Sequence, residues 1–301
     1  MTELGRSRMR RVPVWAGIGF LILFFADNVG VQFEFLSSTA RPAGQVALLV
    51  AAILTAAATI WFYKNVILRR WANREPDELA SSKIRYGVVV GLPLGAALLG
   101  LAFLATVLVG ASVPRVSSTF EVGDVIQVLI LVVVSAVIEE VVFRGLLFHA
   151  LQPLIGWKAC LAITALFFGA AHQLNAHATL WSSFAIAIEG GVLFGLLFIW
   201  KHNLWLTMGV HAGWNLMESL LGVPVSGQEP HGFLDIELQG APLITGGEFG
   251  IEASLITFTL SILVIGIVIV LWRRSLSNVN GLSASCSCHV KPRMLGGRTP
   301  T

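Results

Sequence analysis

Long runs of apolar residues, separated by short polar segments, make up most of this chain. An α-helix needs about 20 mostly apolar residues to cross a bilayer. Eight stretches come close to that length or exceed it. They are Val14–Gln32, Gly44–Tyr63, Tyr86–Ala111, Val125–Leu151, Lys158–Asn175, Phe184–Trp200, Leu204–Leu221 and Ile251–Trp272. The pattern predicts an all-α fold, a polytopic membrane bundle of about eight transmembrane helices.

The lysines and arginines test this count, because cytoplasmic loops of membrane proteins are enriched in both. With the amino terminus in the cytoplasm, 17 of the 20 basic residues fall on cytoplasmic segments and two fall outside, while Arg144 lies within a helix. We therefore expect eight spans with both termini cytoplasmic. The inner connection 64–85 mixes acidic with basic residues and is expected to be a solvated connector. The long outer loop 222–250 is acidic.

Composition narrows the class of protein further. Of the 301 residues, 55% are hydrophobic and only 12% are charged, against about 25% charged in soluble domains. Soluble, disordered and collagen-like chains are excluded, and three cysteines cannot form a disulfide framework. We expect a membrane domain over residues 1–275, a disordered tail over 276–301 in which the role of Cys286 and Cys288 is open, and a bacterial plasma membrane location. The lipid bilayer is the expected partner, nucleic acid is not, and the oligomeric state is open.

The fourth stretch carries three ionisable side chains at mid-span, Glu139, Glu140 and Arg144. Each would cost about 2.5–3.5 kcal/mol if it faced lipid, so all three should face the bundle interior. Glu140 and Arg144 are four residues apart with the acid first, the favourable order for a helical ion pair. Glu139 points about 100° away from Glu140. We interpret Glu139 as a working base, because a purely structural salt bridge would leave it unexplained.

Two other stretches each carry a histidine on a polar helix face. Phe168 and His172 are four residues apart, and so are His211 and Asn215, so each pair shares one side of its helix. Small residues around both histidines allow close helix approach. Counted from the predicted helix ends, Glu139 and His172 lie at different depths, although any shared chemistry requires them to meet.

Two further acidic residues lie in the apolar stretches. Glu218 shares the helix face of His211 and Asn215, and it either supports the site or lies near the outer helix end. Glu189 lies close to the outer end of the sixth stretch, where we expect a solvated cap rather than a ligand.

A glutamate, two histidines and an asparagine in an apolar bundle fit hydrolysis of a peptide bond. A carboxylate and an imidazole can hold and deprotonate a water, and a second imidazole with an amide can stabilise an oxyanion. Alternatively, Glu139, His172 and His211 hold a zinc ion that activates the water. The residues leave both mechanisms open. The sequence contains neither His-Glu-x-x-His nor Gly-x-Ser-x-Gly, the signatures of two other hydrolase classes.

These residues form three spaced motifs that resemble those of the CPBP family, which includes CAAX-type prenyl endopeptidases and bacteriocin-processing or self-immunity proteins, also called Abi proteins. The motifs occur in order and in separate apolar stretches, and the resemblance covers about residues 125–221. They are Glu139-Glu140-x-x-x-Arg144, Phe168-x-x-x-His172 and His211-x-x-x-Asn215.

The resemblance implies an intramembrane endopeptidase that acts on a membrane-associated peptide or protein, with a CAAX-like peptide as one candidate substrate, and it leaves the use of zinc as an implication. The implied roles are Glu139 as general base, His172 as a water ligand, His211 and Asn215 as oxyanion donors, and Glu140, Arg144 and Phe168 as supporting residues. Two other functions compete with this hypothesis. One is a non-catalytic immunity or scaffold protein of the same family, and the other is a transporter or proton relay.

Overall fold

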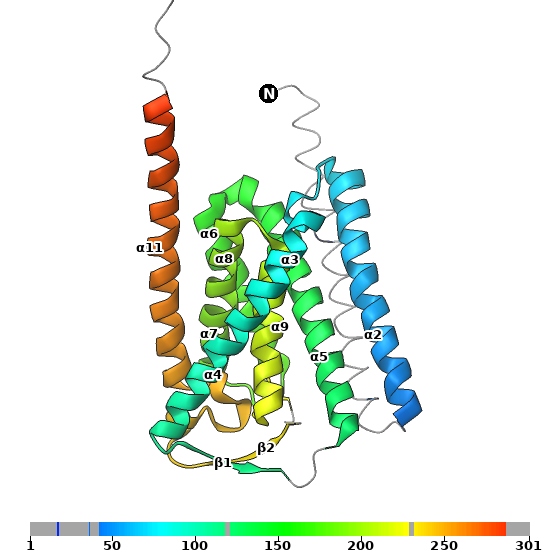
Figure 1. The fold of residues 1–301 in the computed structure, drawn as a ribbon, viewed down its shortest axis with the longest axis vertical. Coiled ribbons are helices and arrows are strands. Elements are labelled where there is room, and N and C mark those ends of the chain that lie inside the picture. Colours follow the sequence, from blue (N-terminus) through cyan, green and yellow to red (C-terminus); the bar gives the residue numbers. More distant parts are fainter. Residues whose placement is uncertain (1–16, 18–35, 37–41, 118–120, 229–231, 287–301) are drawn as a thin grey trace, which may run out of the picture.

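The computed structural model describes residues 17, 36, 42–117, 121–228 and 232–286. Within them the protein is a helical bundle with α2 at one edge, α11 at the opposite edge and α9 in the interior (Figure 1). The helices are α2 (Pro42–Phe62) continued by η1 (Tyr63–Ala72), α3 (Ile84–Tyr86) continued by η4 (Gly87–Gly91) and α4 (Leu92–Leu108), α5 (Val122–Glu140) continued by η5 (Val141–Leu147) and α6 (Phe148–Ala171), α7 (Leu180–Ile186) continued by η7 (Ala187–Phe194) and α8 (Gly195–Lys201), α9 (Leu204–Leu221), and α11 (Leu255–Cys286).

Five helices of the described part are long and apolar enough to cross a membrane, so the chain is a multi-pass membrane protein. They are Ala43–Ala72, Ser81–Leu108, Gly123–Leu174, Leu180–Lys201 and Leu255–Ser277. The predicted number of eight helices is not confirmed. Two predicted stretches form one continuous helical segment, α9 is made less apolar by its own polar residues, and the first predicted stretch, apart from Gly17, lies outside the described residues.

The 52-residue segment Gly123–Leu174 is nevertheless a hairpin. Its helical geometry breaks at Gly156, whose φ of 76° and ψ of 161° are not helical. The Cys160 thiol lies 3.5 Å from the Phe148 carbonyl oxygen, whereas residues twelve apart in a straight helix are about 18 Å apart. The chain therefore reverses direction near Gly156, between the fourth and fifth predicted stretches.

The connections between helices gather at two opposite ends of the bundle. At one end the Lys83 ammonium group donates to the His202 carbonyl oxygen at 2.7 Å, and the Trp157 and Trp272 ring centroids are 5.3 Å apart. At the other end the Asn175 amide donates to the Ser226 carbonyl oxygen at 2.9 Å. The connections predicted to be cytoplasmic thus share one end and those predicted to be outside share the other. Which end faces the cytoplasm stays a prediction.

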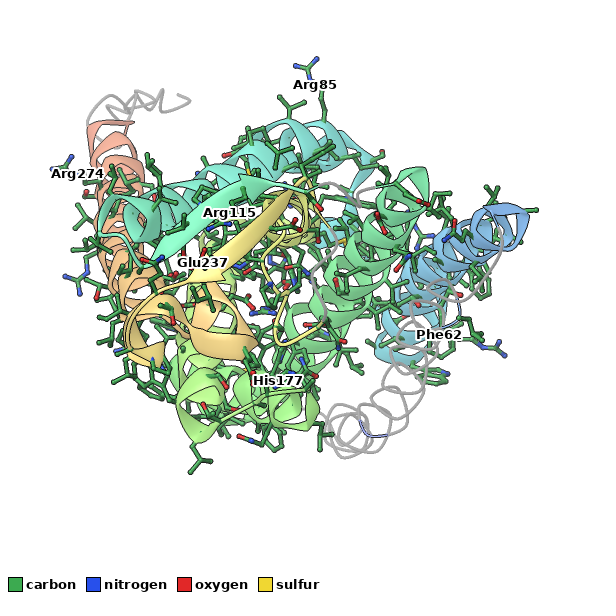
Figure 2. The ribbon with its side chains drawn as sticks, turned by 90° about the horizontal axis from the view of Figure 1, so that it is seen from below. Phe62, Arg85, Arg115, His177, Glu237 and Arg274 are labelled. Carbon is green, nitrogen blue, oxygen red and sulfur yellow. The ribbon has the colours of Figure 1, made fainter. Side chains whose placement is uncertain are left out.

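A two-stranded antiparallel sheet lies across the second end (Figures 1 and 2). It pairs β1 (Ser112–Val116) with β2 (Leu234–Leu238), and an exposed ion pair of 2.7 Å joins Arg115 to Glu237. The predicted helical bundle is confirmed, and this small sheet is an addition that the sequence analysis did not expect. The signal was present in the outer loop, because the Leu234–Leu238 segment alternates apolar and polar residues with the period of a strand.

Helix α9 is held against η4 and α4 by glycines on both sides of the contact. A methyl group built on Gly95 would overlap the Val210 carbonyl oxygen, and one built on Gly213 would overlap the Leu92 carbonyl oxygen. A methyl group built on Gly91 would lie 2.7 Å from the Leu206 carbonyl oxygen, which is also too close. Small residues let transmembrane helices pack backbone against backbone, and here they place α9 and its polar residues in the centre of the bundle.

The connection 64–85 is more structured than predicted. The helix that begins as α2 continues through η1 to Ala72, and Glu78 is buried with 1% of its surface exposed. Arg74 donates to both carboxylate oxygens of Glu78 at 2.9 and 2.7 Å, and the Tyr63 hydroxyl donates to one of them at 2.9 Å. The prediction of a solvated connector is therefore wrong at Glu78, because this acidic side chain and the basic side chain of Arg74 pair with each other at the end of the bundle.

Candidate active site

The side chain of Glu139 meets that of His172, although the two residues are 33 positions apart. Glu139 Oε2 lies 3.9 Å from His172 Nε2, with side-chain exposures of 17% and 11%. The hairpin at Gly156 brings them together, because Glu139 precedes Gly156 by 17 residues and His172 follows it by 16. The mismatch in depth inferred from the sequence disappears, since residues equally far from a hairpin turn lie at the same height.

The backbone orients the ring of His172. Its Nδ1 atom lies 2.8 Å from the Phe168 carbonyl oxygen, one helical turn earlier. A carbonyl oxygen can only accept, so Nδ1 is the donor and carries a hydrogen. In the neutral ring the Nε2 atom, which faces Glu139, is then an acceptor for a water hydrogen.

Glu140 is the centre of a separate buried network. Its Oε1 atom accepts from Arg144 at 2.8 Å, which is the predicted i,i+4 ion pair, and from His211 Nδ1 at 3.1 Å. Arg144 also donates to the carbonyl oxygens of Gly190 and Gly191 in η7. The network thus joins α5, η5, η7 and α9, and it orients His211 with its Nε2 atom directed away from Glu140.

Phe168 fills the space between the two networks. Its ring centroid lies 4.9 Å from that of Phe143, 4.7 Å from that of His172 and 4.6 Å from the Arg144 guanidinium carbon. A side chain at Gly190 would collide with the Phe168 ring. Phe168 therefore acts as packing that separates the Glu140–Arg144 pair from the His172 ring, and the stacked guanidinium gains a cation–π contact.

Asn215 is oriented by a residue that the sequence reasoning did not select. Its amide nitrogen donates to the Ser135 hydroxyl at 3.0 Å, and that hydroxyl in turn donates to the Leu131 carbonyl oxygen at 2.8 Å. Ser135 precedes Glu139 by four residues, so it lies on the same face of α5. That spacing was the one signal in the sequence that could have identified it.

His172, His211 and Asn215 line one small cavity. The space open to the centre of a water molecule is about 10 Å³, which is roughly the room for a single water. Residues of five segments line it, namely Phe168, His172, Ile186, Glu189, Gly190, Phe194, His211, Trp214, Asn215, Ser226 and Glu252. The cavity therefore brings together three of the four predicted catalytic residues, and the fourth, Glu139, contacts His172 at its edge.

Glu252 and Ser226 close the cavity, and the sequence reasoning missed both. The Glu252 carboxylate accepts from Trp214 Nε1 at 3.0 Å and from the Ser226 backbone nitrogen and hydroxyl, each at 2.8 Å. Burial raises the pKa of Glu252, while its hydrogen bonds from Ser226 and Trp214 act in the opposite direction. Both residues come from the acidic outer loop and its junction with α11, where the sequence offers no spacing that relates them to the motifs.

Glu189 is also part of this cavity, which corrects the expectation of a solvated cap. It is 1% exposed and lies in η7, in the middle of the continuous helical segment Leu180–Lys201 rather than near its end. The cap was expected because the predicted stretch began at Phe184, whereas the helix begins at Leu180 with a capping box from Thr179. Glu218, for which the sequence left two readings, is fully buried.

The described residues do not present a ready metal centre. No group of three or more His, Cys, Asp or Glu side chains in the described part of the chain is placed to hold a metal ion. The predicted set Glu139, His172 and His211 is not brought together as such a group among the described residues. The bond of His211 Nδ1 to Glu140 leaves Nε2 as the ring nitrogen that could bind a metal ion. Zinc sites require ligand distances of about 2.0–2.3 Å.

One family model matches the chain, over residues 121–217, and it describes the type II CAAX prenyl endopeptidase Rce1-like family. No curated protein and no solved structure matches the chain. The matched segment contains all seven motif residues, from Glu139 to Asn215, and ends before Ser226 and Glu252. These 97 of the 301 residues are therefore similar to the Rce1-like type II CAAX prenyl endopeptidases, a family of proteases.

Proposed function

We propose that this protein is an intramembrane endopeptidase that hydrolyses a peptide bond of a membrane-associated substrate, with CAAX-like peptides as the first substrates to examine. The observation that carries the proposal is the meeting of Glu139 with His172 at 3.9 Å, beside a cavity that His211 and Asn215 also line. The similarity of residues 121–217 to a protease family supports the same activity.

The 3.9 Å separation is too long for a hydrogen bond, yet one water can contact both side chains. Such a water would donate one hydrogen to Glu139 and the other to His172 Nε2, leaving its oxygen lone pair to attack. The water oxygen bonds to the peptide carbonyl carbon, and Glu139 takes the released proton. When the carbon–nitrogen bond breaks, the leaving nitrogen takes that proton and departs as an amine.

The attacked carbonyl oxygen acquires negative charge, and donors from α9 would stabilise it. Asn215 has a second amide hydrogen besides the one that Ser135 accepts. For His211 to donate through Nε2, the ring must carry a hydrogen on both nitrogen atoms, and the adjacent Glu140 carboxylate would balance the resulting charge. No step of this scheme uses a metal ion.

The test measures cleavage of quenched fluorescent peptides by the purified full-length protein in lipid nanodiscs. Glu139→Gln and His172→Ala should each lower kcat by roughly 10²–10⁴-fold, because general acid–base catalysis contributes about that much. Comparing the membrane peptides of cells that express the wild-type protein or Glu139→Gln would identify natural substrates.

Matched controls are Glu75→Gln and His177→Ala, whose side chains are 74% and 44% exposed. Both should retain the wild-type rate. Full activity in both Glu139→Gln and His172→Ala would refute the peptidase proposal. The non-catalytic immunity or scaffold alternative predicts instead that these two variants keep protecting cells or binding their partner.

A further inference from the structure

Three buried glutamates lie in the segments that build the proposed catalytic cavity, and two of them, Glu189 and Glu252, line it. Glu189 comes from η7, Glu218 from α9 and Glu252 from η9 (Ile251–Ala253), and their exposures are 1%, 0% and 4%. Glu218 follows Asn215, which lines the cavity, by three residues and so lies on the same side of α9. Glu252 has protein donors for both oxygens, but neither oxygen of Glu189 or Glu218 has a hydrogen-bond partner among the described residues.

A buried carboxyl group without a partner is costly. Leaving one buried polar group unsatisfied costs about 1–3 kcal/mol, and more when the group is charged. Two such groups side by side add mutual repulsion whenever both are ionised. A ligand that supplies hydrogen-bond donors and a positive charge would remove both costs.

The position of Glu189 connects this cluster to the proposed chemistry. Glu189 and Glu252 line the same cavity as His172, His211 and Asn215. Arg144, the nearest guanidinium, is held by Glu140 and by the Gly190 and Gly191 carbonyl oxygens. Apart from the two histidines, every charged residue that lines the cavity in the described part of the chain is therefore acidic.

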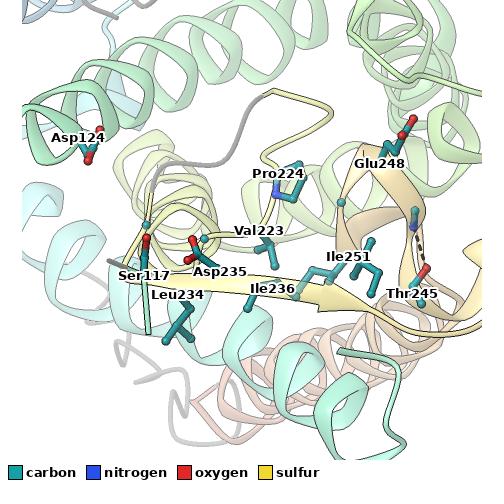
Figure 3. Close-up of a pocket in the computed structure, with 15 residues that line it drawn as sticks. Ser117, Asp124, Val223, Pro224, Leu234, Asp235, Ile236, Thr245, Glu248 and Ile251 are labelled. Carbon is teal, nitrogen blue, oxygen red and sulfur yellow. Dashed lines mark hydrogen bonds between the residues drawn. The ribbon is translucent and has the colours of Figure 1, made fainter. Parts of the chain in front are cut away.

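A larger cavity close to this inner cavity is also lined by acidic residues. It measures about 350 Å³ and lies under β2, where Asp124, Asp235 and Glu248 supply its charged lining among the described residues (Figure 3). It is also lined by Pro224 and Ile251, which belong to the same two segments as Ser226 and Glu252 of the inner cavity. Clefts lined by one sign of charge raise the local concentration of ligands of the opposite sign.

The volume of the inner cavity favours a small cationic group over a large one. The inner cavity holds about one water, so a compact ammonium group fits it far better than a planar guanidinium, and a lysine carries its ammonium on a thin flexible stem. We propose that the site recognises a primary ammonium group of its peptide substrate, as on a lysine near the scissile bond, through Glu189 and Glu218. This inference rests on the proposed peptidase function.

The experiment uses peptide sets in which each position in turn carries lysine, norleucine or arginine, with the full-length protein in nanodiscs. Norleucine lacks the ammonium group but keeps an unbranched aliphatic side chain. At one position we expect kcat/KM for lysine to exceed that for norleucine by roughly 10- to 100-fold, the worth of a hydrogen bond to a charged group, with arginine intermediate. In Glu189→Gln, and separately in Glu218→Gln, the lysine-to-norleucine ratio should fall toward one.

Glu75→Gln serves as the charge-matched control and should keep the wild-type ratio, because its side chain is 74% exposed at the opposite end of the bundle. A wild-type protein that cleaves the lysine and norleucine peptides equally at every position overturns the inference, even if a glutamine variant does not fold. So does a lysine preference that survives in both glutamine variants. These outcomes are separate from failure of the proposed function, which would appear as cleavage of either peptide by Glu139→Gln.

Discussion

Glu139 and Glu140 are neighbours in the chain but have different partners. Glu139 meets His172, while Glu140 binds Arg144 and His211. A helix turns by about 100° per residue, so two adjacent glutamates can serve two networks without competing for the same cation.

Ser135 provides a test of how the proposed oxyanion donor is positioned. We predict that Ser135→Ala lowers kcat about fivefold with little change in KM, because the loss of one orienting hydrogen bond of about 1 kcal/mol lets the Asn215 amide rotate. Asn215→Ala, which removes the donor itself, should lower kcat by roughly 10²–10³-fold. Rates of peptide hydrolysis measured at saturating and at limiting substrate concentrations separate the effect on kcat from the effect on KM.

The control for this prediction is Ser183→Ala, since the Ser183 hydroxyl bonds the Gln173 side chain on the exposed surface. It should behave as wild type. An Asn215→Ala variant with normal kcat would remove Asn215 from the proposed mechanism, and with it the role of Ser135.

At the scale of elements, the contact between α4 and α9 decides where the proposed oxyanion residues lie. Gly95 and Gly213 let the two backbones touch, and α9 carries His211 and Asn215 on the side that faces α5 and η7. The sequence shows these glycines as small residues, but it does not show which helix each one meets.

We predict that Gly95→Val destabilises the protein by about 1–3 kcal/mol, because any side chain at this position overlaps the Val210 carbonyl oxygen and forces the helices apart. The measurement is thermal unfolding in detergent, together with peptide hydrolysis by the fraction that stays folded. Activity should fall as well, since α9 moves relative to Glu139.

The matched control lies five residues further along the same helix. A side chain at Gly100 would meet the end of the Met217 side chain at an ordinary contact distance of 3.7 Å. Gly100→Val should therefore leave the unfolding temperature nearly unchanged. Equal destabilisation by the two substitutions would refute the close contact as the cause.

At the scale of the whole molecule, the two ends of the bundle are closed by different means. The proposed active site lies toward the end covered by β1 and β2, where Ser226 and Glu252 join the outer loop to α9. The opposite end is closed by the buried Glu78, which binds Tyr63 and Arg74 and lies 3.8 Å from His202. That network ties the end of α2 and η1 to the connection between α8 and α9.

The Glu78 network predicts a specific dependence of stability on pH. Burial alone raises the pKa of Glu78, but the hydrogen bonds and charge of Arg74, a backbone hydrogen bond and the Tyr63 hydroxyl together hold that pKa below its ordinary value. A carboxyl whose pKa is lowered in the folded state stabilises it fully above the unfolded-state pKa of about 4.3, and this contribution is lost as the pH falls through the folded-state pKa.

We therefore predict that Glu78→Gln lowers the free energy of unfolding by about 3 kcal/mol at pH 7, and that the difference from wild type shrinks below about pH 4. Unfolding curves in one detergent across this pH range provide the measurement, with Glu75→Gln as the exposed control. A difference that stays constant down to pH 3 would contradict the ion-pair explanation. Catalysis per folded molecule should be unaffected, because Glu78 lies at the end opposite the proposed site.

Much of this architecture could be read from the chain alone. Helix α9 begins and ends where its apolar stretch does, at Leu204 and Leu221, and the Glu140–Arg144 pair follows directly from i,i+4 spacing. Hydropathy and helical periodicity are local properties, so they need no knowledge of distant segments. The family motifs are local in the same sense, since each occupies a single turn or two of helix.

Only the tertiary structure decided which distant groups meet. The hairpin at Gly156 brings Glu139 to the level of His172, and the packing of η7, α9 and the segment before α11 brings Glu189 and Glu252 to one cavity. Ser226 and Glu252 reach the cavity from outside the matched segment. The physical reason is that such contacts depend on turn geometry, backbone approach and side-chain direction across dozens of residues, and none of these leaves a periodic signal in the sequence.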